Sequence, residues 1–146
     1  MSTTATATKP SLTIKRRFNA APAKVFAAFT EPQTISRWFG PPGVTNVRAE
    51  TDLRVGGRYR IAASMGTDEF EVGGSYREIV PNEKLVYTWA WKSTPERESL
   101  VTITLKPDGA GTLMTLMHEQ FFDDEARDRH NQGWTGALDK LEKLFA

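Results

Sequence analysis

Hydrophobic and polar residues alternate along most of the chain, as in strands with one buried face. The alternation begins at residues 11–18 and is clearest over residues 85–91, where every odd position is large and apolar. It returns at 101–105 and 114–118. Turn-forming residues separate these runs at short intervals, and no intervening segment has the length and spacing of a crossover helix. The pattern therefore predicts a meander of consecutive antiparallel strands.

Three segments have helical spacing instead. Asn19 is a candidate N-cap for a first short helix that has Pro22 in its first turn. A second short helix is expected from about residue 32 and must stop at Gly40-Pro41-Pro42-Gly43. Residues 123–145 repeat apolar side chains at helical spacing behind an acidic first turn. They predict an amphipathic helix of roughly twenty residues, about 30 Å long.

Glycines mark turns and places of close packing. Gly56-Gly57 is interpreted as a hairpin turn and Gly73-Gly74 as a bulge or sharp bend, because neither pair has the strand-to-helix context of a phosphate-binding loop. Gly133 and Gly136 lie inside the predicted long helix, where each costs about 1 kcal/mol relative to alanine. They indicate a segment packed closely against the helix or, alternatively, a lumen beneath it.

The order of these elements predicts an α+β fold of the helix-grip type. A curved antiparallel sheet of about six to seven strands wraps around the long C-terminal helix, and the two short helices close one end. Residues 1–10 are expected to form a disordered tail and residues 11–146 the domain. One helix does not fill so curved a sheet, so we expect an apolar cavity, which is the usual form of a small-molecule site.

The composition of the chain limits the kinds of partner and site that can be expected. The chain has 146 residues, with 19 Lys and Arg against 18 Asp and Glu, a net charge of +1. That balance argues against nucleic acid as the main partner. The absence of cysteine excludes disulfides, thiolate catalysis and thiolate metal sites. No stretch approaches the ~20 apolar residues of a membrane span, and no signal peptide is evident, so the expected location is the cytoplasm.

Candidate chemistry is sparse. The two histidines, His118 and His130, lie in different elements without a carboxylate at metal-binding spacing, so we expect no metal and no cofactor. His118 shares the face of Met114 and Leu116, and three interpretations stay open: a satisfied core histidine, a polar anchor on the cavity wall, or a general acid or base. Asp52 and Arg54 form either a structural ion pair or a ligand-orienting pair.

Aromatic residues are the strongest functional signal. Four tryptophans fall on elements that would surround one cavity, and indole rings suit a flat, ring-containing ligand; alternatively, they are simply core. We expect a mainly apolar cavity of ~300–1,000 Å³. Its predicted lining is Trp38, Phe39, Tyr59, Tyr76, Tyr87, Trp89, Trp91, Leu116, His118, Trp134 and Leu138.

Several motifs together resemble a known family. They include Asn19-Ala20-Ala21-Pro22, Arg37-Trp38-Phe39-Gly40-Pro41, Asp52-Leu53-Arg54-Val55-Gly56-Gly57, the segment from Gly74 to Pro81, and Gly133-Trp134. From about residue 12 to residue 146 the chain resembles bacterial proteins named after the C-terminal domain of the activator of the heat-shock-protein-90 ATPase, in the START-like superfamily. The resemblance implies a helix-grip fold. Only about ten residues precede the first strand, where the eukaryotic activators carry a chaperone-docking domain.

These observations predict binding or sequestration of a small hydrophobic ligand, which is aromatic, polyketide-like or lipid-like, and not catalysis. One alternative is a cyclase or isomerase-like enzyme that uses His118 or a buried carboxylate such as Glu69, Glu71 or Glu78. The other is a protein-interaction module, regulatory or associated with a chaperone and so with the stress response.

Overall fold

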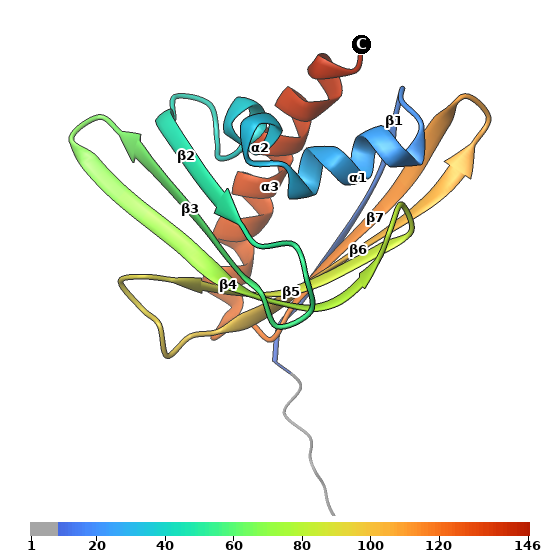
Figure 1. The fold of residues 1–146 in the computed structure, drawn as a ribbon. Helices are drawn as coiled ribbons and strands as arrows, with labels where there is room; N and C mark the ends of the chain where they lie inside the picture. The colour runs from blue at the N-terminus through green and yellow to red at the C-terminus, as the bar shows by residue number, and fades with distance from the viewer. Residues whose placement is uncertain (1–8) are drawn as a thin grey trace, which may run out of the picture.

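The computed structural model describes residues 9–146 and has the predicted α+β helix-grip fold (Figure 1). A seven-stranded antiparallel sheet has the order β1-β7-β6-β5-β4-β3-β2 and curls around the C-terminal helix. The elements in chain order are β1 (Leu12–Phe18), α1 (Pro22–Thr30), α2 (Pro32–Trp38), β2 (Thr45–Thr51), β3 (Arg58–Met65), β4 (Asp68–Val80), β5 (Lys84–Trp91), β6 (Ser99–Asp108), β7 (Gly111–Glu119) and α3 (Asp124–Leu144).

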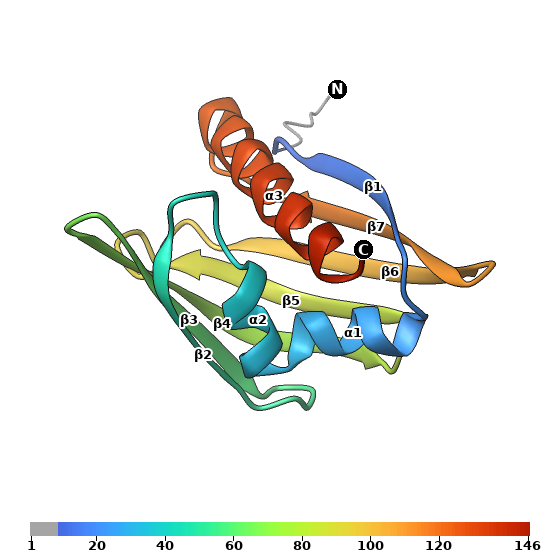
Figure 2. The same ribbon diagram turned by 90° about the horizontal axis from the view of Figure 1, so that it is seen from above.

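Helix α3 lies across the concave face of the sheet (Figures 1 and 2). Asp123 is its N-cap and accepts a hydrogen bond from the Ala126 backbone N–H at 2.8 Å. The predicted apolar face is buried: Trp134 is 5% exposed, and Leu138 and Leu141 are fully buried. The alternating positions of β7 bury Met114, Leu116 and His118 on the same side, as their spacing predicted.

Helices α1 and α2 cover one end of the concave face beside α3 (Figure 2). Helix α1 begins at Pro22, and its N-cap is Ala21, which makes no side-chain cap bond. The prediction of Asn19 as the cap is wrong, because Asn19 lies two residues ahead of the extended residue that precedes the helix. Trp38 closes the corner between the two helices by donating its indole N–H to the Ala28 carbonyl at 2.9 Å.

The loop between α2 and β2 packs against α3. A Cβ atom at Gly136 would lie 2.8 Å from Pro42 Cδ, whereas one at Gly133 would meet nothing within 4 Å. The close packing predicted from these two glycines is therefore confirmed at Gly136 alone. Lys140 of α3 donates to the carbonyls of Phe39 (3.2 Å) and Pro41 (3.5 Å). These bonds tie the loop to the helix.

Two close backbone contacts shape β4. A Cβ atom at Gly74 would lie 2.1 Å from the Thr88 carbonyl oxygen, and one at Gly73 would lie 2.9 Å from the Tyr59 carbonyl oxygen. The pairing register does not shift at Gly73-Gly74, so the prediction of a bulge at this pair is wrong. The two glycines instead allow the neighbouring backbones to approach closely. The bulge lies a few residues further on, between Tyr76 and Glu78.

Near the N-terminus, Pro10 belongs to the packed structure because its carbonyl accepts the Phe121 backbone N–H at 3.1 Å. Residues 1–8 of the predicted tail lie outside the described residues. Within residues 9–146, no helix is both long enough and apolar enough to cross a membrane.

Candidate functional site

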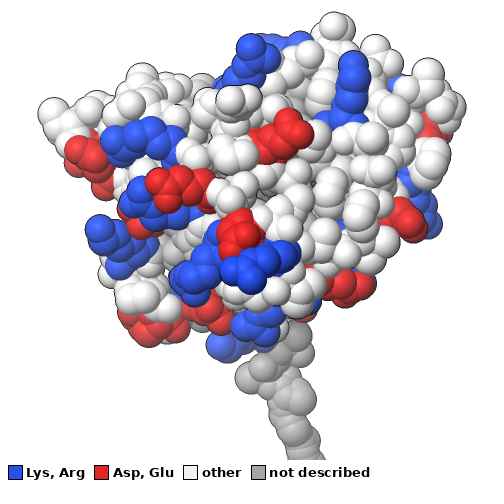
Figure 3. Space-filling model, in the orientation of Figure 1, with Lys and Arg blue, Asp and Glu red and all other residues white. Residues whose placement is uncertain are grey.

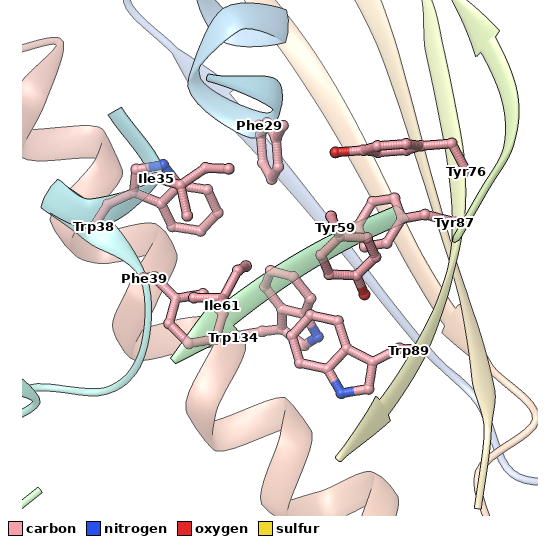
Figure 4. Close-up of a pocket in the computed structure, with 10 residues that line it drawn as sticks. All are labelled: Phe29, Ile35, Trp38, Phe39, Tyr59, Ile61, Tyr76, Tyr87, Trp89 and Trp134. Carbon is pink, nitrogen blue, oxygen red and sulfur yellow. The ribbon is translucent and has the colours of Figure 1, made fainter. Parts of the chain in front are cut away.

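A small internal cavity lies between α2, α3 and the concave face of the sheet (Figure 4). Seven of its ten lining residues belong to the predicted set. The prediction missed Phe29, Ile35 and Ile61, although Phe29 and Ile35 lie on the apolar faces of the short helices and Ile61 shares the strand face of Tyr59. The complete lining is Phe29, Ile35, Trp38, Phe39, Tyr59, Ile61, Tyr76, Tyr87, Trp89 and Trp134.

The cavity has a volume of about 20 Å³, which is room for about one water molecule. The predicted volume of ~300–1,000 Å³ is therefore wrong for this conformation. Aromatic rings from the short helices fill the space: Phe29 packs against Trp38 at 5.0 Å between ring centroids, and Phe39 against Trp89 at 6.2 Å. The alternation along the strands predicted which aromatic rings of the sheet point inward. It did not predict how closely α2 packs over those rings.

Three tyrosines on neighbouring strands form one wall, and we call Tyr59, Tyr76 and Tyr87 the tyrosine cluster. Their ring centroids lie 5.2 to 6.3 Å apart. Tyr59 donates its hydroxyl to the Thr88 carbonyl at 2.6 Å. The hydroxyls of Tyr76 and Tyr87 make no hydrogen bond to another of residues 9–146. Both oxygens keep some surface that water can reach, because no fully buried side-chain oxygen among these residues lacks a partner.

Burial raises the pKa of all three phenols, that of Tyr76 to about 12. The carboxylate of Asp52 also raises the pKa of Tyr76, and the charge of Tyr76 raises that of Tyr87. All three hydroxyls therefore remain protonated near neutral pH and act as hydrogen-bond donors.

A second aromatic group lies beside the cavity, and we call Trp89, Trp91, Trp134, His118 and His130 the tryptophan–histidine cluster. Trp134 Nε1 lies 3.0 Å from His118 Nδ1, and His118 Nε2 lies 2.7 Å from Ser99 Oγ. An indole N–H only donates, so Nδ1 accepts and Nε2 carries the proton that binds Ser99. Ser99 in turn donates to the Trp89 carbonyl at 3.2 Å. His118 is thereby fixed as a neutral tautomer.

His130 is held in the same way. Its Nε2 accepts the indole N–H groups of Trp91 (2.9 Å) and Trp89 (3.3 Å), and its Nδ1 lies 2.7 Å from the Ala126 carbonyl. Burial lowers the pKa of both imidazoles, that of His118 to about 2, with a further lowering from the nearby His130. Both histidines are therefore neutral hydrogen-bonding groups of the core at neutral pH.

This network decides between the interpretations of His118. Its side chain is fully buried, both ring nitrogens have protein partners, and it does not line the cavity. It is a satisfied core histidine and not the polar anchor. Trp91, Leu116 and Leu138, predicted to line the cavity, also lie outside its lining. Every indole N–H is engaged within the protein, so the tryptophans offer the cavity only their rings.

The carboxylates that the enzymatic alternative needs lie elsewhere. Glu69 pairs with Arg48, Glu71 with Arg60 and Glu78 with Lys84, and none of these glutamates lines the cavity. The Arg54 Nε lies 2.8 Å from Asp52 Oδ2 within the β2–β3 loop, so the two residues form an ion pair, and neither lines the cavity.

An open hollow of about 550 Å³ on the sheet contains Arg48, Arg60, Glu69, Glu71 and Lys92 in its lining. Figure 3 shows acidic and basic side chains interleaved on the side of the molecule that β2, β3 and β4 occupy. These charges largely pair with one another, with Arg60 3.0 Å from Glu71 and 3.3 Å from Glu50. Residues 9–146 contain no group of three or more metal-ligating side chains. The internal cavity is therefore the better candidate site.

The curled sheet, the long helix across it and the apolar cavity between them define a helix-grip protein of the START-like class. A family model for "Activator of Hsp90 ATPase homolog 1-like protein" matches residues 19–146. The chain belongs to this family.

Relatives support the assignment. The chain is 25% identical over 124 residues to the human "Activator of 90 kDa heat shock protein ATPase homolog 1", covering 84% of this chain but only 33% of the human protein. Its fold is similar to that of the AHSA1 protein of Silicibacter pomeroyi, with 29% identity, a TM-score of 0.81 and coverage of 92% and 96% of the two chains. An uncharacterized protein of Rhizobium leguminosarum has 30% identity, a TM-score of 0.77 and 93% coverage of both chains.

Proposed function

We propose that the protein binds a small, ring-bearing hydrophobic molecule in the cavity between α2, α3 and the sheet. The lining carries this proposal: all ten side chains are aromatic or isoleucine, and none is charged. An apolar, concave lining with a few polar groups is the usual character of a small-molecule site. Rings from several directions would desolvate a flat ligand on both of its faces.

Binding requires the cavity to expand, because even a single-ring ligand needs about 150 Å³. The wall formed by α2 and the loop after it is the one whose movement leaves the sheet intact, at the cost of the Lys140 bonds to the Phe39 and Pro41 carbonyls. Helix α2 has seven residues, and the loop contains Gly40 and Gly43 at φ of 82° and 96°. The opposite wall consists of strands paired on both sides. Outward movement of Ile35 and Phe39 would open space without breaking the sheet.

The experiment enlarges the cavity from its movable side. Ile35→Ala removes a lining side chain, so a ligand such as naphthalene no longer has to displace it and should bind more tightly than to the wild type. Ile103→Ala is the matched control, because Ile103 is equally buried but lies outside the cavity lining. Quenching of tryptophan fluorescence and titration calorimetry report the affinity.

If Ile35→Ala or Ile103→Ala does not fold, valine at the same positions replaces it. An absence of saturable binding in both the wild type and the Ile35 variant, across naphthalene, steroid, flavonoid and fatty-acid probes, would rule the proposal out.

A second candidate function is protein interaction, and the β2–β3 loop favours it. The loop exposes Leu53 (43%) and Val55 (65%). It is anchored to β4, because the Gly56 N–H donates to the Tyr76 carbonyl at 2.8 Å and the Tyr76 N–H to the Gly57 carbonyl at 2.9 Å. Arg54 and Arg58 are exposed in and beside the loop. This combination suits an acidic protein surface with an apolar depression, and the name of the human relative suggests a 90 kDa heat shock protein as the partner.

The ATPase rate of a purified chaperone of that class tests the interaction. The wild-type chain should change the rate, and Leu53→Asp should abolish the change. Leu113→Asp is the control, since Leu113 is exposed to a similar degree (40%) on β7. An unchanged rate, together with no complex by analytical ultracentrifugation, would exclude this partner.

A further inference from the structure

The two unpartnered hydroxyls of the tyrosine cluster indicate which kind of molecule the cavity takes. We infer that the ligand carries a neutral acceptor oxygen, such as a ketone, which the hydroxyls of Tyr76 and Tyr87 bind. This inference rests on the proposed ligand-binding function and narrows its ligand class. It depends on where these hydroxyls lie, on their lack of partners and on the charge of the lining.

Tyr76 and Tyr87 are placed to act together. They face each other across the β4–β5 pairing, with ring centroids 6.3 Å apart and ring planes at 70°. Both line the cavity. Figure 4 shows the ring of Tyr76 extending from β4 across the cavity towards Phe29, with the hydroxyl at its inner end, and Tyr87 entering the same space from β5. A carbonyl oxygen has two lone pairs, so one oxygen atom of a ligand that lies within reach of both hydroxyls can accept from both.

The hydrogen-bonding state of these hydroxyls is unlike that of the other aromatic polar groups nearby. Tyr76 is 2% exposed and Tyr87 is 7% exposed. The little surface that they keep includes their hydroxyl oxygens, because no fully buried side-chain oxygen among residues 9–146 lacks a partner. Buried tyrosine hydroxyls usually have a partner, and Tyr59 has one in the Thr88 carbonyl. The neighbouring indoles of Trp89 and Trp134 also have partners. Within the cavity lining, the two free phenols are therefore the groups available to a polar atom of the ligand.

The absence of charged side chains in the lining determines whether the polar group of the ligand is charged or neutral. None of the ten lining side chains is Lys, Arg, His, Asp or Glu. The nearby Lys140 donates to the carbonyls of Phe39 and Pro41. A buried carboxylate or ammonium group would thus lack a counter-charge, which makes its transfer from water unfavourable. A ketone, aldehyde, ester or amide oxygen avoids this penalty and still satisfies both donors.

The test compares 1-tetralone with tetralin, which share a bicyclic skeleton and differ by one carbonyl group. The measured quantity is the ratio of their dissociation constants, by titration calorimetry, in the wild type and in Tyr→Phe variants. Each hydrogen bond should contribute about 2- to 10-fold to the preference for the ketone. Tyr76→Phe and Tyr87→Phe should each lower the preference, and the double variant should abolish it. Ile103→Val, at a buried position outside the cavity lining, is the control and should leave it unchanged.

Two further readouts separate a direct bond from a change in packing. The carbonyl stretch of bound 1-tetralone should lie at lower frequency in the wild type than in the double variant. The carboxylate 1-naphthoate should bind at least tenfold more weakly than 1-tetralone. A ketone preference that persists in the double variant, or a carbonyl frequency that does not change, overturns the inference and leaves the proposed function intact. Absence of binding of both ligands to the wild type and to Ile35→Ala overturns both.

Discussion

The tryptophan–histidine cluster and the tyrosine cluster are adjacent aromatic groups of one core, but they differ in whether their polar atoms have hydrogen-bond partners within the protein. In the first, all three indole N–H groups and all four imidazole nitrogens have partners within the protein. In the second, Tyr59 has a partner, while Tyr76 and Tyr87 present their hydroxyls to the cavity with none among the described residues.

The difference shows that aromatic content alone does not identify a ligand site. A hydrogen bond within the protein contributes about 1 kcal/mol to stability, so a fully paired cluster stabilises the fold. Hydroxyls that meet a space without a protein partner are instead available to a ligand. Trp89 and Trp134 belong to the tryptophan–histidine cluster and also line the cavity. Their N–H groups bind histidines, and their rings line the cavity.

The largest effect should follow from breaking the tryptophan–histidine cluster. Trp134→Ala should lower the free energy of unfolding by about 3–5 kcal/mol, because it removes a buried indole and leaves His118 Nδ1 without its donor. Urea denaturation at neutral pH measures the loss. Trp134→Phe, which keeps a ring but not the N–H, should lose less. A loss below about 1 kcal/mol for the alanine variant would mean that Trp134 is a wall residue and does not support the cluster.

Acid should weaken the same cluster. The pKa of His118 is lowered to about 2 in the folded state, chiefly by burial, whereas an unfolded histidine titrates near pH 6.5. Below pH 6.5 the unfolded chain binds a proton that the folded chain does not. The stability is therefore complete above that pH and falls by about 1.4 kcal/mol per pH unit below it. His130, whose pKa is also lowered, adds to the loss.

Urea unfolding at pH 7.5, 6.5 and 5.5 measures this slope, in a range above most carboxylate titrations. In the variant His118→Gln, the glutamine side chain can accept a hydrogen bond from Trp134 and donate one to Ser99. Because glutamine does not titrate, the slope of stability against pH should fall by the contribution of one proton, about 1.4 kcal/mol per pH unit. Independently of that variant, the ring resonances of His118 in the folded wild type should not titrate between pH 7.5 and 5. A midpoint near 6.5 would show that the imidazole is accessible to protons and that the cluster is not closed.

Features that depend on local periodicity were predictable from the sequence. The alternation around Tyr87 and Trp89 predicted that both side chains point to the inner face of the sheet. The spacing of Trp134 and Leu138 predicted which face of α3 is buried. Features set by contacts between distant segments were not. Trp91 and His130 are 39 residues apart, and neither residue type signals that it will bind the other. The cavity volume likewise depends on how side chains of α2 interdigitate with the sheet, which no single segment specifies.

The smallest expected effect is the difference in stability between variants that each lack one hydroxyl of the tyrosine cluster. Tyr59→Phe should lower the free energy of unfolding by about 1 kcal/mol, because it removes the bond to the Thr88 carbonyl. Tyr76→Phe and Tyr87→Phe remove no bond between described residues and keep the ring, so each should change stability by less than about 0.5 kcal/mol. Urea denaturation of the three variants under one set of conditions makes the comparison, and the unchanged ring contacts make each variant a control for the others. Equal losses in all three would mean that the hydroxyls of Tyr76 and Tyr87 stabilise the fold as that of Tyr59 does, and the contrast between the two clusters would then disappear.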